Sequence, residues 1–198
     1  MATVTNQLMS LLEHNGGVLR FSDARALGVS APSITKFARK EGLERVGKGF
    51  YIDPNAWIDE MHVLSLRIGK AVFSHESALL LHGLAEREPE QMTVTVPSGY
   101  NATGLRRDGV CVHYVRPELH SMGRVEMPTF DGNLVATYDL ERTICDLIRN
   151  RSRIEKQVFI SALQSYARSP QKRLDFMSEY AARLGIERVV RNYLEVLL

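Results

Sequence analysis

The chain has 198 residues, of which 44% are hydrophobic and 24% charged, and this balance is typical of a soluble globular protein. No stretch reaches the roughly 18 continuous apolar residues of a membrane-spanning helix, and the first residues lack the basic segment of a secretion signal. Cys111 and Cys145 belong to no CxxC pair or Cys/His cluster. We therefore expect a cytoplasmic protein without a membrane anchor, a disulfide framework or a zinc site.

Charge is distributed unevenly along the chain. Residues 1–58 contain 7 Lys+Arg and 5 Asp+Glu, residues 59–150 contain 9 and 13, and residues 151–198 contain 9 and 5. Two basic ends therefore flank an acidic middle. Basic segments attract polyanions such as nucleic acid, although solvated helix faces would explain the C-terminal excess equally well.

The N-terminal region has the pattern of three short helices. Apolar residues at i, i+4, i+7 and i+8 predict a first helix at residues 3–14. A second helix is predicted at residues 23–27, with Ser22 as its N-cap and a glycine at its end. Ser30 then caps a third helix, and Pro32 fits its first turn because no backbone N–H is needed there.

The third helix has one apolar stripe and several polar faces. Ile34, Phe37 and Ala38 follow helical spacing and should form its buried side. Hydroxyl and cationic side chains on the other faces can reach phosphates or base edges in a DNA major groove. The predicted DNA-contacting residues of this helix are Ser33, Thr35, Lys36, Arg39 and Lys40.

A small hairpin follows the third helix. Residues 43–46 and 50–52 predict two strands around a Gly-Lys-Gly turn, where the glycines permit a tight reversal. Arg45 on the first strand and Lys48 at the tip are placed to contact DNA, although an ordinary surface hairpin would show the same pattern. This order of elements predicts a winged helix-turn-helix, a DNA-binding domain covering residues 1–55.

The remaining residues, 56–198, predict a mixed domain. A helix is expected at 56–69 because its apolar stripe is typical of a core-facing helix: Trp57, Met61, Leu64 and Ile68. Strands are expected at 71–73, 92–96, 110–115, 124–127 and 134–137. Further helices are expected at 74–84, 140–150, 154–168, 172–184 and 186–198, the first two capped by Ser74 and Asp139. The predicted fold class is α+β: the winged helix-turn-helix, then a small, mostly antiparallel sheet and a helical C-terminus.

No convincing catalytic arrangement emerges from the sequence. It contains no GxSxG, Walker or GxGxxG motif. His75, Glu76 and His82 lack the HExxH spacing of a zinc site, which favours a structural role. Cys145 and His113 could form a nucleophile and its base, but a thiol on the apolar side of a helix favours a core position.

A metal-dependent nuclease would need acidic residues, and usually a lysine, converging on a strand pair. Acidic residues do lie among the predicted strands: Asp108, Glu118, Glu126 and Asp131. However, the chain has no lysine between Lys70 and Lys156. The sequence therefore favours a protein that is not an enzyme and needs neither a metal nor another cofactor.

Three segments carry a resemblance to a known family. They are SHESALLLHGL at 74–84, MTVTVP at 92–97 and FDGNLVATYDLERTICDLI at 130–148. In this order, behind a winged helix-turn-helix, they resemble the AbiEi family of antitoxins from bacterial type IV toxin–antitoxin, or abortive infection, systems. The resemblance covers residues 5–150, and the family supplies no catalytic residues.

The resemblance implies a function in phage defence. Members of the family bind inverted repeats in their own promoter and repress the operon, and they counteract a nucleotidyltransferase-like toxin without forming a stable complex with it. Antitoxicity would reside in residues 56–198, with Arg142 tying its helix to the sheet. A dimer, or two monomers, would match the symmetry of an inverted repeat.

Three other functions stay open at this point. One is a nuclease that uses the winged helix for targeting, and a second is a stand-alone transcriptional regulator without a toxin. The third is a protein-interaction module whose winged helix binds another protein.

Overall fold

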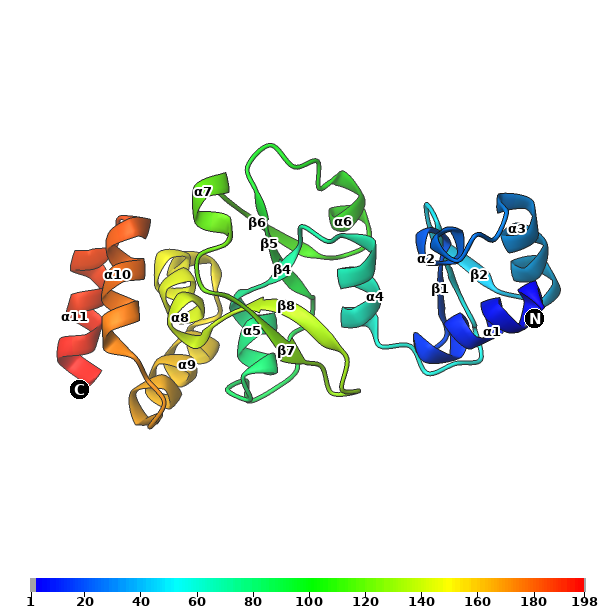
Figure 1. Ribbon diagram of the computed structural model, residues 1–198. Coiled ribbons are helices and arrows are strands. Elements are labelled where there is room, and N and C mark those ends of the chain that lie inside the picture. The colour runs from blue at the N-terminus through cyan, green and yellow to red at the C-terminus, as the bar shows by residue number, and fades with distance from the viewer. Residues whose placement is uncertain (1–2, 198) are drawn as a thin grey trace. The chain divides into compact units, whose positions relative to one another are not determined.

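The computed structural model describes residues 3–197 and divides the chain into two compact units, Met1–Arg67 and Ile68–Leu198 (Figure 1). We call them unit 1 and unit 2. The helix that the sequence assigned to the second domain groups with unit 1 instead, so the division falls after Arg67 and not after residue 55.

Unit 1 combines helices with a three-stranded antiparallel sheet. Its elements are α1 (Val4–His14), β1 (Val18–Arg20), α2 (Phe21–Ala26), α3 (Ala31–Lys40), β2 (Glu44–Gly47), β3 (Phe50–Ile52) and α4 (Glu60–Arg67). Strand β3 is central and pairs with both β1 and β2. The first three helices and the sheet share one apolar core: Leu8, Leu12, Leu19, Ala24, Val29, Ile34 and Phe37.

Two of the three helix starts in this core have a side-chain cap, and the one at Ser30 was expected. The Thr3 hydroxyl accepts the N–H of Asn6, and the Ser30 hydroxyl accepts the N–H of Ser33. The prediction for Ser22 was wrong, because α2 begins at Phe21 and has no side-chain cap. The sheet sets this start, since the N–H of Phe21 donates to the carbonyl of Gly49, 2.8 Å away.

Helix α4 begins later than its apolar stripe suggested. The Asp53 carboxylate accepts the N–H of Asn55 and holds a turn, and the Asp59 carboxylate accepts the N–H of His62 at the start of the helix. Such carboxylate contacts favour turns and caps over helix interiors. Trp57 therefore precedes α4 and is 83% exposed, although Leu64 is buried as expected.

Unit 2 is built on a five-stranded sheet. Its strands are β4 (Val72–Phe73), β5 (Thr93–Pro97), β6 (Cys111–Val115), β7 (Arg124–Pro128) and β8 (Leu134–Tyr138). Its helices are α5 (His75–Leu81), α6 (Thr103–Arg107), α7 (Pro117–His120), α8 (Leu140–Arg149), α9 (Lys156–Arg168), α10 (Leu174–Leu184) and α11 (Glu187–Leu197), with a short 3-10 turn at Arg151–Arg153. The spatial strand order is β6-β5-β4-β8-β7.

The α+β class is confirmed, but the expectation of a mostly antiparallel sheet is wrong. Strands β4 and β5 pair antiparallel, as do β7 and β8, whereas β5 pairs parallel with β6 and β4 parallel with β8. Residues 98–110 explain part of the difference. Helix α6 lies in this segment and carries the chain back so that β6 runs parallel to β5, as a parallel connection requires.

Helix α8 lies at the centre of the helical part of unit 2. Residues 141–148 are all buried, because α5, α9, α10 and α11 pack around this helix (Figure 1). Asp139 caps it as predicted, accepting the N–H of Arg142. A helix covered on all sides must also bury its polar residues, and these need partners inside the protein.

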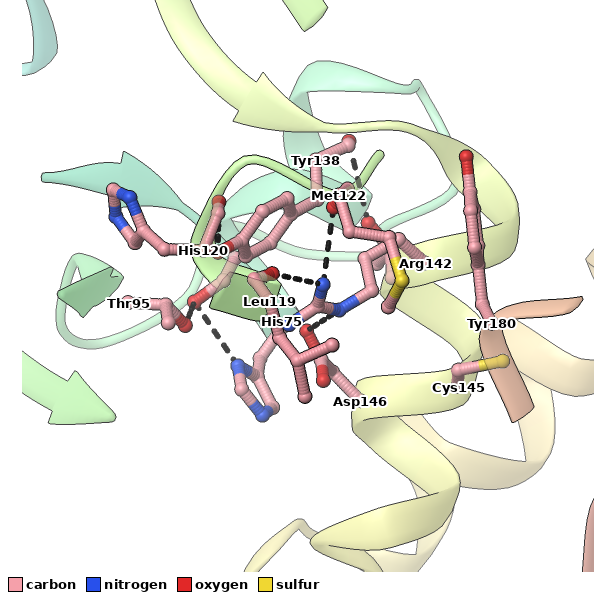
Figure 2. A network of polar contacts seen from close by, with 12 residues as sticks. His75, Thr95, Leu119, His120, Met122, Tyr138, Arg142, Cys145, Asp146 and Tyr180 are labelled. Carbon is pink, nitrogen blue, oxygen red and sulfur yellow. Dashed lines mark hydrogen bonds and ion pairs between the residues drawn. The ribbon is translucent and has the colours of Figure 1, made fainter. Parts of the chain in front are cut away.

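The guanidinium of Arg142 supplies the main polar connection between α8 and the rest of unit 2 (Figure 2). Its Nη1 donates to the carbonyls of Leu119 and Met122, at 2.9 and 3.0 Å, and its Nε donates to Asp146 at 3.0 Å. Its Cζ lies 4.3 Å from the centre of the Tyr138 ring. Arg142 is fully buried and Asp146 nearly so, which makes this i,i+4 ion pair a core contact.

The backbone at Gly123 is shaped to this side chain. A Cβ atom on Gly123 would lie 2.7 Å from the Cβ of Arg142, and its φ of +71° is one that glycine adopts without strain. The carbonyl of Gly123 also accepts the N–H of Asp139, so the loop is held directly against the start of α8.

Replacing Arg142 should destabilise unit 2 severely. In Arg142→Met, Asp146 would remain buried without its cation, and we expect a loss of about 3–5 kcal/mol in the free energy of unfolding. Adding Asp146→Leu should restore part of this loss because it removes the uncompensated charge. Urea denaturation followed by far-UV circular dichroism measures both variants.

The Arg142–Asp146 coupling is absent if the double variant is destabilised by the sum of the two single changes or more. Arg183→Met on α10 is a suitable control, because its ion pair with Glu179 is exposed and should contribute less than about 1 kcal/mol.

Candidate DNA-binding surface

Helix α3 is held in unit 1 by one side. Ile34 is fully buried, and Phe37 and Ala38 are 5% and 2% exposed, so the predicted apolar stripe is confirmed. The Ser30 hydroxyl fixes the first turn, and its Oγ also lies 2.8 Å from the Oγ of Ser33. Because three adjacent positions are packed, the rotation of α3 about its axis is determined.

The opposite side of α3 is open to solvent and basic. Thr35, Lys36, Arg39 and Lys40 are exposed, and Ser33 is half-buried. Lys40 pairs with Glu41 at 3.1 Å, and the Thr35 hydroxyl donates to the carbonyl of Ala31. Within the described residues, Lys36 and Arg39 form no ion pair, so their charges are available to a polyanion.

The β2–β3 hairpin presents the other two predicted residues. Gly47 pairs with Phe50, so Lys48 and Gly49 form a two-residue turn with Lys48 exposed at the tip. The φ of Gly49 is +84°, as the second central position of a type II turn requires. Arg45 is exposed as well, but its Nε donates to the carbonyl of Gly47 and so also supports the hairpin.

Two further cations of unit 1 have positioning roles that the sequence reading overlooked. Arg25 on α2 donates from Nη1 to the carbonyl of Val29, which fixes the turn between α2 and α3. Arg67 on α4 packs against the hairpin, where its Nε would lie 3.3 Å from a Cβ placed on Gly47. The Arg25 contact joins residues four apart, so local sequence spacing is a signal for it. The Arg67 contact depends on tertiary packing, for which local spacing gives no signal.

Structure does not support the Cys145–His113 nucleophile pair. Cys145 is fully buried, its Sγ faces the carbonyl of Met177 at 3.8 Å, and burial raises the pKa of this thiol to about 12. His113 instead stacks on His75, with ring centres 3.7 Å apart, and its Nε2 lies 3.7 Å from the Sγ of Cys111.

His75 is held as a neutral imidazole. Its Nδ1 lies 3.0 Å from the Ser74 hydroxyl, and its Nε2 lies 3.0 Å from the Asn150 side-chain nitrogen. A protonated ring would direct a second N–H at that amide nitrogen, which is itself a donor. Burial, the neighbouring His113 and the Arg142 charge lower the pKa of His75 well below its usual value.

The contact with His75 also changes the role of Ser74. The expected helix cap is wrong, because its hydroxyl accepts from Thr95 and makes no capping bond to α5. His75 itself has a φ of +50°, an uncommon conformation for a residue other than glycine. These contacts join α5 to β5 and to the end of α8 and have the character of a folding motif.

Four carboxylates of unit 2 line one cavity, and Glu86 and Glu155 have side-chain partners within it. Glu76, Glu86, Glu90 and Glu155 line a cavity of about 570 Å³. Glu155 pairs with Arg87, and Glu86 accepts the hydroxyl of Ser161. Among the described residues, no group of three or more His, Cys, Asp or Glu side chains is placed to hold a metal ion.

Comparison with known proteins bears on unit 1 most directly. Residues 6–52 match the family described as "Transcriptional regulator, AbiEi antitoxin". This segment, which carries most of unit 1, is therefore similar to the AbiEi antitoxin family. The resemblance noted in the sequence is therefore confirmed in the segment that carries α3 and the hairpin. The match supports a DNA-binding regulator. The motifs in unit 2 lie outside the matched residues, so their assignment to an AbiEi antitoxin remains an expectation.

One solved structure resembles most of the chain in fold. The RV2827C protein from Mycobacterium tuberculosis superposes with a TM-score of 0.63, covering 89% of this chain and 70% of that one. The two sequences are 12% identical, so the likeness shows a shared fold and not a shared function. No curated protein matches the sequence. Within residues 3–197, no helix is long and apolar enough to cross a membrane.

Acidification should destabilise unit 2 through its buried histidines. Burial lowers the pKa values of His75 and His113, so below about pH 6.5 the unfolded chain binds protons that the folded chain does not. Stability should therefore fall as pH drops from 7.5 to 5.5, by up to about 1.4 kcal/mol per pH unit for each histidine. Thermal denaturation across this range measures the slope.

His75→Asn separates this effect from general acid sensitivity, because asparagine tolerates the positive φ and does not titrate. The variant should have a shallower slope whatever its absolute stability. An unchanged slope would show that His75 does not contribute. His14→Asn, at an exposed position on α1, is the matched control and should leave the slope as it is.

Proposed function

We propose that this protein is a DNA-binding antitoxin and transcriptional autorepressor, in which unit 1 is a winged helix-turn-helix. The basic, solvent-facing side of α3 carries the proposal. In support, the order helix, strand, helix, helix, strand, strand matches that module, and the family match is confined to these elements.

In this proposal α3 enters the major groove of double-stranded DNA. Lys36 and Arg39 contact phosphates, and the hydroxyls of Ser33 and Thr35 lie near base edges. Lys40 adds charge at the end of the helix. The hairpin acts as the wing, with Lys48 at its tip and Arg45 along its strand, and contacts the adjacent backbone or minor groove.

The target is an inverted repeat in the promoter of the protein's own operon. Two copies, as a dimer or as separate monomers, would occupy its half-sites, as the symmetry of such sites favours. The operon is of type IV, and its toxin resembles a nucleotidyltransferase that the antitoxin counteracts without a stable complex. Unit 2 supplies that activity as a folded module, in the cytoplasm and without catalysis, metal or cofactor.

Removing the unpaired cations of α3 should weaken operator binding. Each phosphate contact contributes a slope of about one to the dependence of log affinity on log salt concentration. Lys36→Ala with Arg39→Ala should therefore lower affinity for the upstream DNA and reduce that slope by about two. Gel-shift titrations at two or more salt concentrations measure both quantities.

A matched control removes two cations elsewhere. Arg87→Ala with Arg116→Ala lowers the net charge equally, and both side chains are exposed ion-pair members in unit 2. This variant should keep the wild-type salt slope. If Lys36→Ala with Arg39→Ala binds the DNA as the wild type does at every salt concentration, α3 is not the DNA-binding element.

The two proposed activities should be separable. When the neighbouring toxin is expressed from an independent promoter, Lys36→Ala with Arg39→Ala should still protect cells from it, because unit 2 is unchanged. Wild-type and variant protein levels are matched by immunoblot, and growth is the measurement. Failure of the wild type to protect against any adjacent gene product would instead favour a stand-alone regulator.

A further inference from the structure

A groove between α9 and α11 forms an apolar surface that the proposed DNA binding does not use. Its volume is about 510 Å³. The two helices contact each other within unit 2. Phe159 and Tyr193 meet edge to face at its base, with ring centres 5.4 Å apart.

The two helices line this groove with the same spacing. Helix α9 contributes positions 159, 160, 163 and 164, and helix α11 contributes positions 188, 189, 192 and 193. Both sets follow i, i+1, i+4 and i+5, so each helix presents two successive turns to the groove. A pair of helices that leaves such a surface open can accept a third helix, whose apolar residues recur at i, i+3 or i+4 and i+7.

The polar lining of the groove has one sign of charge. Arg151 and Arg188 are exposed lining residues, and the described lining contains no carboxylate. Arg188 has no ion-pair partner among the described residues, whereas nearby Glu187 is paired with Arg191 at 3.1 Å. An occupant with carboxylates beside its apolar stripe would therefore complement this surface.

We propose that the groove receives an amphipathic helix with acidic flanks from another protein. A DNA backbone would use the two arginines but not the apolar floor, where Ile160 is 39% exposed. A second copy of the chain docked by the same face would bring Arg151 and Arg188 toward their own counterparts, because a two-fold interface joins identical surfaces. The chemistry of the groove thus favours a protein partner of opposite charge.

A designed peptide tests this proposal. The probe is a helical peptide of about 15 residues with leucines at i, i+4, i+7 and i+11 and glutamates on the flanking positions. Its counterpart carries lysine at every glutamate. We expect the acidic peptide to bind the full chain saturably in fluorescence anisotropy and the lysine peptide to bind at least about tenfold more weakly.

Variants locate the binding. Ile160→Glu should abolish it, and Arg151→Glu with Arg188→Glu should weaken it by about tenfold or more. Arg183→Glu on α10 lies outside the groove lining and should have no effect. Circular dichroism checks that each variant is folded. If Ile160→Glu is not folded, Ile160→Ser takes its place.

Four outcomes overturn the proposal. They are the absence of saturable binding, equal binding of the two peptides, equal affinity of the groove variants and the Arg183→Glu control, and displacement of the peptide by duplex DNA of random sequence. Sedimentation of the chain alone supplies one more: if Ile160→Glu converts a dimer to a monomer, a second copy occupies the groove.

Discussion

Burial of one side of α3 determines what unit 1 can present to a partner. Ile34 and Phe37 pack into the same core as α1 and β1, and Ala38 is buried as well, so the helix cannot rotate without exposing them. Complete burial of a side chain the size of Ile34 or Phe37 contributes roughly 1.5–3 kcal/mol. The exposed positions between them are therefore fixed in direction. Packing of the apolar side keeps Lys36 and Arg39 pointing away from the core.

Unit 2 depends on a different constraint, the complete burial of α8. A helix that is covered on all sides has to place its charged groups among partners, and Arg142 does so with Asp146, two backbone carbonyls and the face of Tyr138. At the other carboxylates of α8, Glu141 and the cap Asp139 both accept from Arg173, and Asp139 also accepts from Tyr180. These contacts join the loop, the sheet and α10 to one helix. They account for the RTICDL motif as a folding requirement.

Local sequence patterns were sufficient for much of unit 1. Helical spacing identified the buried stripe of α3, and Ser30 identified its start, because both depend on residues within one or two turns. The same reasoning failed where distant groups compete. Ser22 does not cap α2, because the backbone bond from the N–H of Phe21 to the carbonyl of Gly49 sets where that helix begins. Trp57 lies outside α4, because the Asp59 carboxylate accepts the N–H of His62 and caps the helix there. Strand direction in unit 2 and the burial of Arg142 depend on contacts between segments far apart in sequence, which spacing along the chain does not encode. The seven predicted DNA-contacting residues lie on the expected elements, α3 and the β2–β3 hairpin. Their contact with DNA remains a prediction.

Backbone amide NMR shifts during titration with the upstream inverted repeat would test the account most directly. They report on every region of the chain at once and need no substitution. The largest changes should fall on residues 33–40 and 45–49, with residues in the α9–α11 groove unaffected. Changes concentrated in unit 2, with α3 and the hairpin unaltered at saturation, would contradict the assignment of unit 1 as the DNA-reading element.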